Sequence, residues 1–272
     1  MKKPYVISAE LDLANPNIIN PGAVEGFRES LDADLRRVGK DTLWVPSSSI
    51  QNGLKRILAK TLLPVVSLDD RYISDADRFV GISRGVDAEL NDAGYVPRVS
   101  YESIVDQLDQ IAVLGKEIVI ADDVVFSGEM LSWFADQLRA QGVKIGGVIC
   151  GIAIREGVEK LALEGIDVDA VLTIDDVEDE ICERDFAVVP GSGRRIVDLS
   201  ANALYFDNIY GKPQPWASLP MVDSASFCTN SLSRSLNLLQ PTVPMQNVGS
   251  FLGYGQSGTA REQLLARIGG AR

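Results

Sequence analysis

The hydrophobic positions of the chain follow two alternating spacings from about residue 78 onwards. Short continuous apolar runs, typical of strands buried on both faces, occupy residues 78–83, 117–121, 148–154 and 169–174. Between these runs the apolar residues recur at helical spacing, as Leu131, Phe134, Ala135 and Leu138 do. Strands that alternate with amphipathic helices predict an α/β fold, with a parallel sheet covered by helices on both faces.

The remaining segments give weaker patterns. We expect a helix from Ala23 to Val38, a strand at 42–45, a helix over 52–63 and a turn with a short helix over 84–94. A strand is expected over 95–101, and Pro97 would either place it at a sheet edge or restrict it to its near end. A helix over 102–115 has Ser100 as a possible cap, and 259–270 predicts a short amphipathic helix.

The segment after residue 200 is rich in proline and poor in charge, and residues 226–258 show no clear period. It could cap a crevice, form an oligomer contact or be partly mobile. We predict three parts: an N-terminal segment and helix (1–39), an α/β core (40–200), and a proline-rich cap or interface (201–272). The two terminal parts would form a hood.

Composition removes several classes of function. The net charge of −12 argues against binding along a nucleic-acid backbone. The chain has no histidine, which excludes a histidine base, a Ser-His-Asp triad and His-ligated zinc. Its three cysteines are widely spaced, and no apolar run has the length of a membrane span. With no pattern of a signal peptide at the N-terminus, we expect a cytoplasmic protein without membrane contact.

The stretch "IVIADDVVFSGEML" carries the main chemical signal. It places Asp122 and Asp123 at the end of an apolar strand, before a Ser127-Gly128 turn and a helix. Adjacent carboxylates suit vicinal hydroxyls or a hydrated Mg²⁺, and the free N–H groups at a helix start suit a phosphate. These two features together describe a pocket for ribose 5-phosphate.

This stretch resembles the ribose-phosphate motif of type I phosphoribosyltransferases, and "FVGISRG" resembles the pyrophosphate loop of that family. The resemblance covers about residues 78–175. It implies that Asp122 and Asp123 contact the ribose hydroxyls and Mg²⁺. It also implies that the phosphates of phosphoribosyl pyrophosphate are bound by two segments, whose residues are Ser83, Arg84 and Gly85, and Val125, Phe126, Ser127, Gly128, Glu129 and Met130.

The chain departs from the family pattern at the turn. Glu129 stands where Gly or Lys is usual, Met130 replaces a usual Thr, and Phe126 stands where some members carry an acid. The stretch between Gly85 and Asp122 is too short for the long mobile lid of many members. On the base side, Phe186 and Arg194 are candidates by position only.

The leading hypothesis is therefore a Mg²⁺-dependent phosphoribosyltransferase that transfers phosphoribosyl to or from a nitrogenous base, with a homodimer as one candidate oligomeric state. The departures favour a second hypothesis, a catalytically altered protein of the same fold that binds a ligand or regulates. A phosphatase or hydrolase of a phosphorylated ribose is a third. The alternatives without ribose phosphate are a solvated acidic turn, a receiver-like acidic pocket, which lacks its matching Lys, and a dinucleotide site, for which "GISRG" has the wrong spacing.

Overall fold

The computed structural model describes residues 2–197, 199, 201–206, 214–220, 224–251 and 253–270. Its contacts divide the chain into two compact units. Unit 1 comprises residues 1–44, 84–94 and 178–272, and unit 2 comprises residues 45–83 and 95–177. The chain thus passes back and forth between the units. The three-part division at residues 39/40 and 200/201 stays a prediction about which segments fold together.

Unit 2 contains the parallel sheet that the apolar runs predict. Its five strands lie in the order β4-β3-β7-β8-β9, and every neighbouring pair is parallel. The strands are β3 (Val65–Ser67), β4 (Arg78–Phe79), β7 (Glu117–Val125), β8 (Lys144–Ile154) and β9 (Val168–Ile174). The helices are α2 (Ser47–Leu58), α3 (Ile104–Ala112), α4 (Glu129–Ala140) and α5 (Arg155–Leu163).

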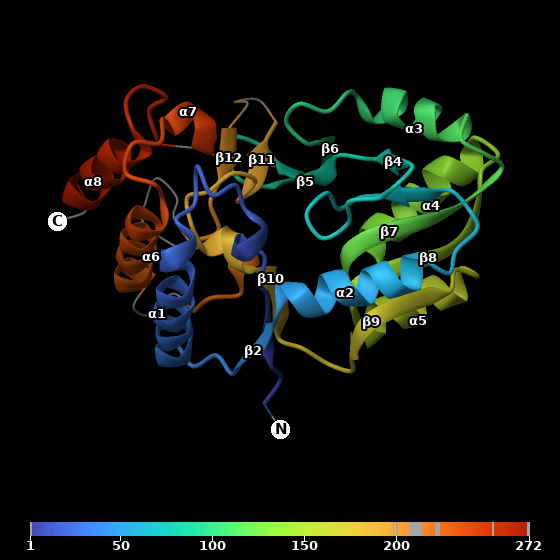
Figure 1. Ribbon diagram of the computed structural model, residues 1–272, viewed down its shortest axis with the longest axis horizontal. Coiled ribbons are helices and arrows are strands. Elements are labelled where there is room, and N and C mark those ends of the chain that lie inside the picture. The colour runs from blue at the N-terminus through green and yellow to red at the C-terminus, as the bar shows by residue number, and fades with distance from the viewer. Residues whose placement is uncertain are drawn as a thin grey trace. The chain divides into compact units, whose positions relative to one another are not determined.

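Helices cover both faces of this sheet, as the alternating pattern predicts (Figure 1). A Cβ on Gly151 of β8 would meet Ile50 of α2, so that face of β8 lies against α2. Its neighbour Cys150 points to the opposite face, because successive side chains of a strand alternate. Cys150 is buried there in one cluster with Phe134 of α4 and Leu161 of α5. The predicted inward face of α4 is confirmed, because Leu131, Phe134, Ala135 and Leu138 are all buried.

Unit 1 joins the two ends of the chain. A three-stranded sheet has the order β10-β1-β2, with β1 (Tyr5–Ser8), β2 (Thr42–Val45) and β10 (Asp179–Cys182). Around it the chain forms α1 (Val24–Arg37), α6 (Ser224–Leu238), α7 (Met245–Val248) and α8 (Ala260–Gly270). A second sheet has the order β12-β11-β5-β6, with β5 (Ile82–Val86), β6 (Asp92–Pro97), β11 (Arg194–Ile196) and β12 (Ala201–Ala203). Of β5 and β6, only residues 84–86 and 92–94 belong to unit 1.

Three local expectations from the sequence are wrong. Residues 84–94 form no helix, because they make the hairpin between β5 and β6, whose turn is held by the Asp87 side chain accepting from the N–H groups of Glu89 and Asn91. Ser100 does not cap α3: the cap is Ser103, whose hydroxyl accepts from the Asp106 N–H. The stretch 226–258 contains most of helix α6, whose sparse charges hide its amphipathic character. Of the two expectations for the strand with Pro97, the edge position is confirmed by β6.

The described part of the C-terminal stretch belongs to the core of unit 1. Buried residues of α6, α7 and α8 share one hydrophobic cluster with residues of β1 and α1; they include Phe227, Leu232, Leu238, Met245, Val248, Ala260 and Leu264. Of the helices within the described residues, none has the length and hydropathy needed to cross a membrane.

Candidate functional site

The acid pair lies inside strand β7 and not after it, which differs from the expectation. Strand β3 pairs with β7 only as far as Ser67, opposite Ala121, whereas β8 continues beside β7 to Val125. Asp122 and Asp123 therefore begin where β7 has lost its partner on one side. The backbone there is satisfied locally, because Asp122 Oδ1 accepts from the Asp123 N–H (3.0 Å) and Asp123 Oδ1 from the Val124 N–H (2.8 Å).

The two acids have different environments. Asp122 is 2% exposed and its Oδ2 is buried without a hydrogen-bond partner among the described residues, while Asp123 is half-buried. The pKa of Asp122 is raised well above its usual value, first by burial and then by the neighbouring Asp123 carboxylate. Asp123 is thus the acid of the pair that a ligand can reach.

A third carboxylate, that of Asp69, acts on Asp122, and the sequence analysis did not identify it. It follows β3, the strand that pairs with β7, and is 3% exposed. Its oxygens accept from the backbone N–H groups of Arg71, Tyr72 and Ile73 at 2.7–3.1 Å. Its charge contributes to the raised pKa of Asp122, and the Arg98 guanidinium opposes that shift. Its signal in the sequence was the short apolar run "VVS" before it, which is too brief to stand out as a strand.

The turn after the pair brings two backbones into close contact. Gly128 is buried with a left-handed φ of 73°, and it directly precedes the first residue of α4, Glu129. The turn packs on Gly157 in the first turn of α5, where an added Cβ would lie 2.3 Å from the Phe126 carbonyl oxygen. Ser127 is half-buried and its hydroxyl accepts from the Glu129 N–H at 3.4 Å, while Phe126 and Glu129 are exposed and Met130 is half-buried.

The other predicted site residues lie in segments away from β7 in sequence, in β5, in the core of unit 1 and in β11. Ser83, Arg84 and Gly85 form part of strand β5 and not a free loop, and the boundary between the two units falls between Ser83 and Arg84. Phe186 is 0% exposed between the rings of Tyr5 and Phe227, so it offers no surface for a base. Arg194, in β11, lies over the ring of Trp216, with 4.7 Å from its guanidinium carbon to the ring centroid.

Comparisons with known proteins give similarity in structure only. No protein-family model matches this chain, and no curated protein does. The chain is similar to solved structures of phosphoribosyltransferases. A UMP synthase of Leishmania donovani is 14% identical over 47% of this chain and 27% of its own, with a TM-score of 0.30. An adenine phosphoribosyltransferase of Thermoanaerobacter pseudethanolicus is 13% identical over 47% and 79%, with a TM-score of 0.32. An orotate phosphoribosyltransferase of Aeropyrum pernix is 17% identical over 46% and 69%, with a TM-score of 0.30.

The buried acid gives a testable pH dependence. Because the folded-state pKa of Asp122 is raised, the folded protein loses stability as pH rises from the unfolded-state pKa through the folded-state pKa. Asp122→Asn removes this loss while retaining an acceptor for the Asp123 N–H. We expect the free energy of unfolding of the variant to exceed that of the wild type by at least about 1 kcal/mol at neutral pH, because the variant no longer buries a charged oxygen without a partner.

The measurement is thermal unfolding of both proteins at pH about 5 and about 8, in EDTA, with the gap in Tm wider at the higher pH. Asp175→Asn, which replaces an acid whose side chain is 79% exposed, is the control. A gap that is equal at both pH values would contradict a raised pKa at Asp122.

Proposed function

We propose that unit 2 binds the ribose 5-phosphate part of phosphoribosyl pyrophosphate, and that the protein transfers the phosphoribosyl group to or from a nitrogenous base. The observation that carries this proposal is the continuous path from the acid pair of β7 through Ser127-Gly128 into α4. Within a few residues it offers an accessible carboxylate for hydroxyl groups and a helix start for a phosphate.

Because Asp122 and Asp123 differ in burial, we assign them different roles. Asp123 is the proposed contact to the ribose hydroxyls, because it is half-buried and thus reachable. Asp122 is a positioning residue: its Oδ1 accepts from the Asp123 N–H, and this contact fixes the backbone that carries Asp123. A carboxylate beside the ribose also stabilises the positive charge that develops on the sugar ring as the bond to pyrophosphate breaks.

A divalent cation would fit this site if it binds together with the substrate. The described residues contain no group of three or more ligating side chains that could hold a metal by themselves. Mg²⁺ is commonly held through one or two carboxylates together with substrate phosphates, so the half-buried Asp123 would be its carboxylate ligand on the protein side, while the buried Asp122 keeps its positioning role. Bound there, the cation would neutralise charge on the leaving pyrophosphate.

Replacing the accessible acid tests the proposal. Asp123→Asn should weaken binding of phosphoribosyl pyrophosphate in the presence of Mg²⁺ by about ten- to a hundredfold, because charge-assisted hydrogen bonds are lost. Calorimetry on the wild type, Asp123→Asn and the exposed control Asp175→Asn measures the effect. Equal affinity in all three proteins, or no binding to the wild type, would leave Asp122 and Asp123 as structural residues of β7 without a ribose-phosphate ligand.

Turnover separates the two leading hypotheses. Release of pyrophosphate by the wild type, with a panel of nitrogenous bases, would identify a transferase. Tight binding without release would support the ligand-binding or regulatory protein, which the hydrophobic, exposed Phe126 and the acidic Glu129 at the first turn of α4 favour.

A further inference from the structure

A hollow in unit 2 is lined by residues other than those of the acid pair and the turn after it. It has a volume of about 400 Å³ and is lined by β4 and the residue before it, by residues 100–102 and by α3: Asp77, Arg78, Phe79, Ser100, Tyr101, Glu102 and Gln107. None of these residues belongs to the proposed ribose-phosphate site. Small-molecule sites span about 300–1,000 Å³, so this volume suits a compact ligand with a single ring.

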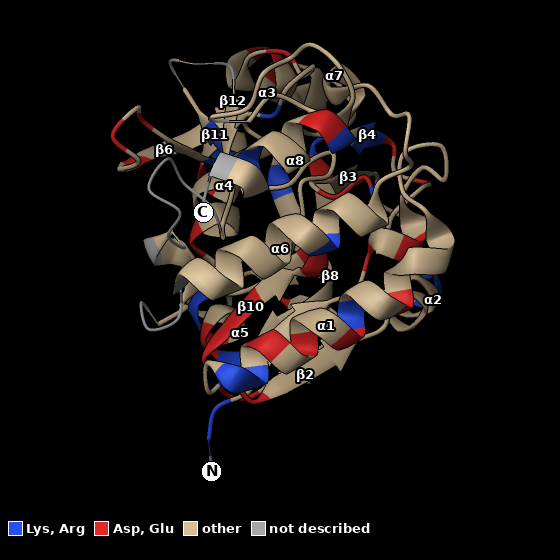
Figure 2. Ribbon diagram, turned by 90° about the vertical axis from the view of Figure 1, so that its left-hand side faces the viewer, with Lys and Arg blue, Asp and Glu red and all other residues tan. Residues whose placement is uncertain are grey.

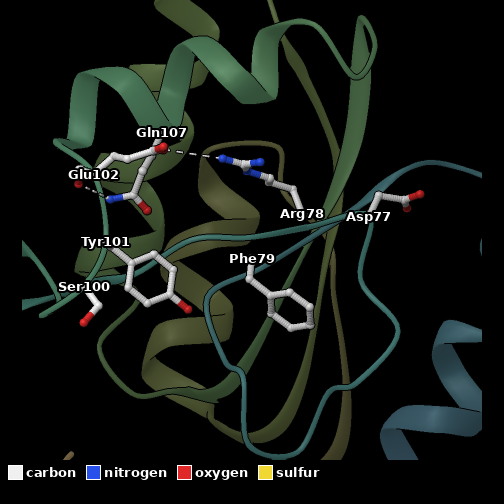
Figure 3. Close-up of a pocket in the computed structure, with 7 residues that line it drawn as sticks. All are labelled: Asp77, Arg78, Phe79, Ser100, Tyr101, Glu102 and Gln107. Carbon is white, nitrogen blue, oxygen red and sulfur yellow. Dashed lines mark hydrogen bonds and ion pairs between the residues drawn. The ribbon is translucent and has the colours of Figure 1, made fainter.

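The walls of the hollow are held in place by hydrogen bonds and close packing. The Gln107 side chain accepts from the Gly81 N–H (2.8 Å) and donates to the Glu102 carbonyl oxygen (2.9 Å), which ties α3 to both neighbouring segments. The Tyr101 ring packs directly on Gly81, where an added Cβ would lie 2.2 Å from it. The rings of Tyr101 and Phe79 both border the open space (Figure 3).

Arg78 is the positive charge of the lining, and its ion pair with Glu102 is a long one. Its Nε is buried and has no partner among the described residues. Its Nη2 lies 3.6 Å from Glu102 Oε2, too far for a hydrogen bond. A guanidinium has five N–H donors in a planar fork that matches an oxyanion, so this side chain lacks an acceptor that a ligand can supply.

The acids of the lining do not block such a ligand. The Asp77 carboxylate accepts from the Val65 N–H at 2.7 Å and points away from the other six side chains (Figure 3). Glu102 has a second partner, because its Oε2 also accepts from Gln110 Nε2 at 2.6 Å. Glu102 can therefore release Arg78 to a ligand and keep a hydrogen bond of its own.

We propose that this hollow binds a small planar ring compound that carries a carboxylate. The carboxylate pairs with the Arg78 guanidinium, and the ring contacts Tyr101 and Phe79, where aromatic faces favour a flat apolar body. The site is independent of the proposed ribose-phosphate chemistry, since it shares no residue with it.

Fluorine NMR of 4-fluorobenzoate with the full chain tests the proposal. We expect its signal to broaden on titration with the wild type, and Arg78→Gln to weaken binding by about tenfold or more, because the charged fork is lost. Arg155→Gln removes a guanidinium that is 51% exposed and paired with Asp175, so this control should bind as the wild type does. Phe79→Leu should weaken binding severalfold, whereas Asp123→Asn should leave it unchanged.

Two further probes identify the chemistry. Uncharged 4-fluorobenzamide should bind about tenfold more weakly than the benzoate, and inorganic phosphate should compete poorly because it lacks the ring. Circular dichroism checks the fold of each variant, and Arg78→Lys, which keeps the charge but loses the fork, should bind with intermediate affinity. The proposal is overturned if the wild type leaves the signal unchanged, if Arg78→Gln and Arg78→Lys both bind as the wild type does, or if phosphate displaces the benzoate at equal concentration.

Discussion

Gly157→Ala is expected to destabilise the protein by about 3 kcal/mol, although the same change usually stabilises a helix. The added Cβ would lie 2.3 Å from the Phe126 carbonyl oxygen and 3.0 Å from the Gly128 nitrogen. Both atoms belong to the backbone, which cannot rotate away as a side chain can. The turn that follows the acid pair must therefore shift, and binding of phosphoribosyl pyrophosphate should weaken with it if this turn holds the phosphate.

The matched control is Gly26→Ala in α1. Gly26 is exposed within a helix and an added Cβ meets nothing within 4 Å, so this variant should gain about 0.5–1 kcal/mol. Chemical unfolding followed by circular dichroism compares both variants with the wild type. If Gly157→Ala is as stable as Gly26→Ala, the close approach of the turn to α5 does not exist.

Asp34→Leu is expected to lower the free energy of unfolding by about 3–5 kcal/mol, because it leaves the buried guanidinium of Arg234 without its acid. Asp34 of α1 pairs with Arg234 of α6, and the two side chains are only 4% and 5% exposed. The pKa of Arg234 is lowered by burial, which the pairing with Asp34 partly offsets. Figure 2 shows α6 almost without charge beside a strongly charged α1, and α6 contains no acid that could pair with Arg234 in place of Asp34.

The double variant Asp34→Leu/Arg234→Met tests that explanation. Removing both charges should recover at least about 1 kcal/mol of the loss, since no unpaired charge stays buried. Arg36→Gln, which breaks a pair with Asp32 at an arginine that is 68% exposed, should change stability by less than about 0.5 kcal/mol. A double variant less stable than Asp34→Leu would show that Arg234 contributes through its packing and not its charge.

The sequence by itself determined the α/β architecture of unit 2 and the inward face of α4. Continuous apolar runs and helical spacing are local consequences of burial on two faces or on one, so they can be read without knowing the partners. The succession of acid pair, small-residue turn and helix could be predicted from the sequence in the same way. Its residues are contiguous in the chain, and the structure places them on β7, the turn and α4.

Pairing between distant segments was decided only by the tertiary structure. Strand β3 has three residues, too few for a visible period, yet its parallel pairing with β7 brings Asp69 to Asp122. Residues 84–94 form part of a hairpin, and its strand β5 pairs with β11, which is about 110 residues further along the chain. Helix α6 is defined by burial against α1 and not by its own charge pattern. The burial that separates Asp122 from Asp123 likewise arises from the neighbouring chain segments, because two adjacent aspartates are equivalent in a sequence until the fold surrounds one of them.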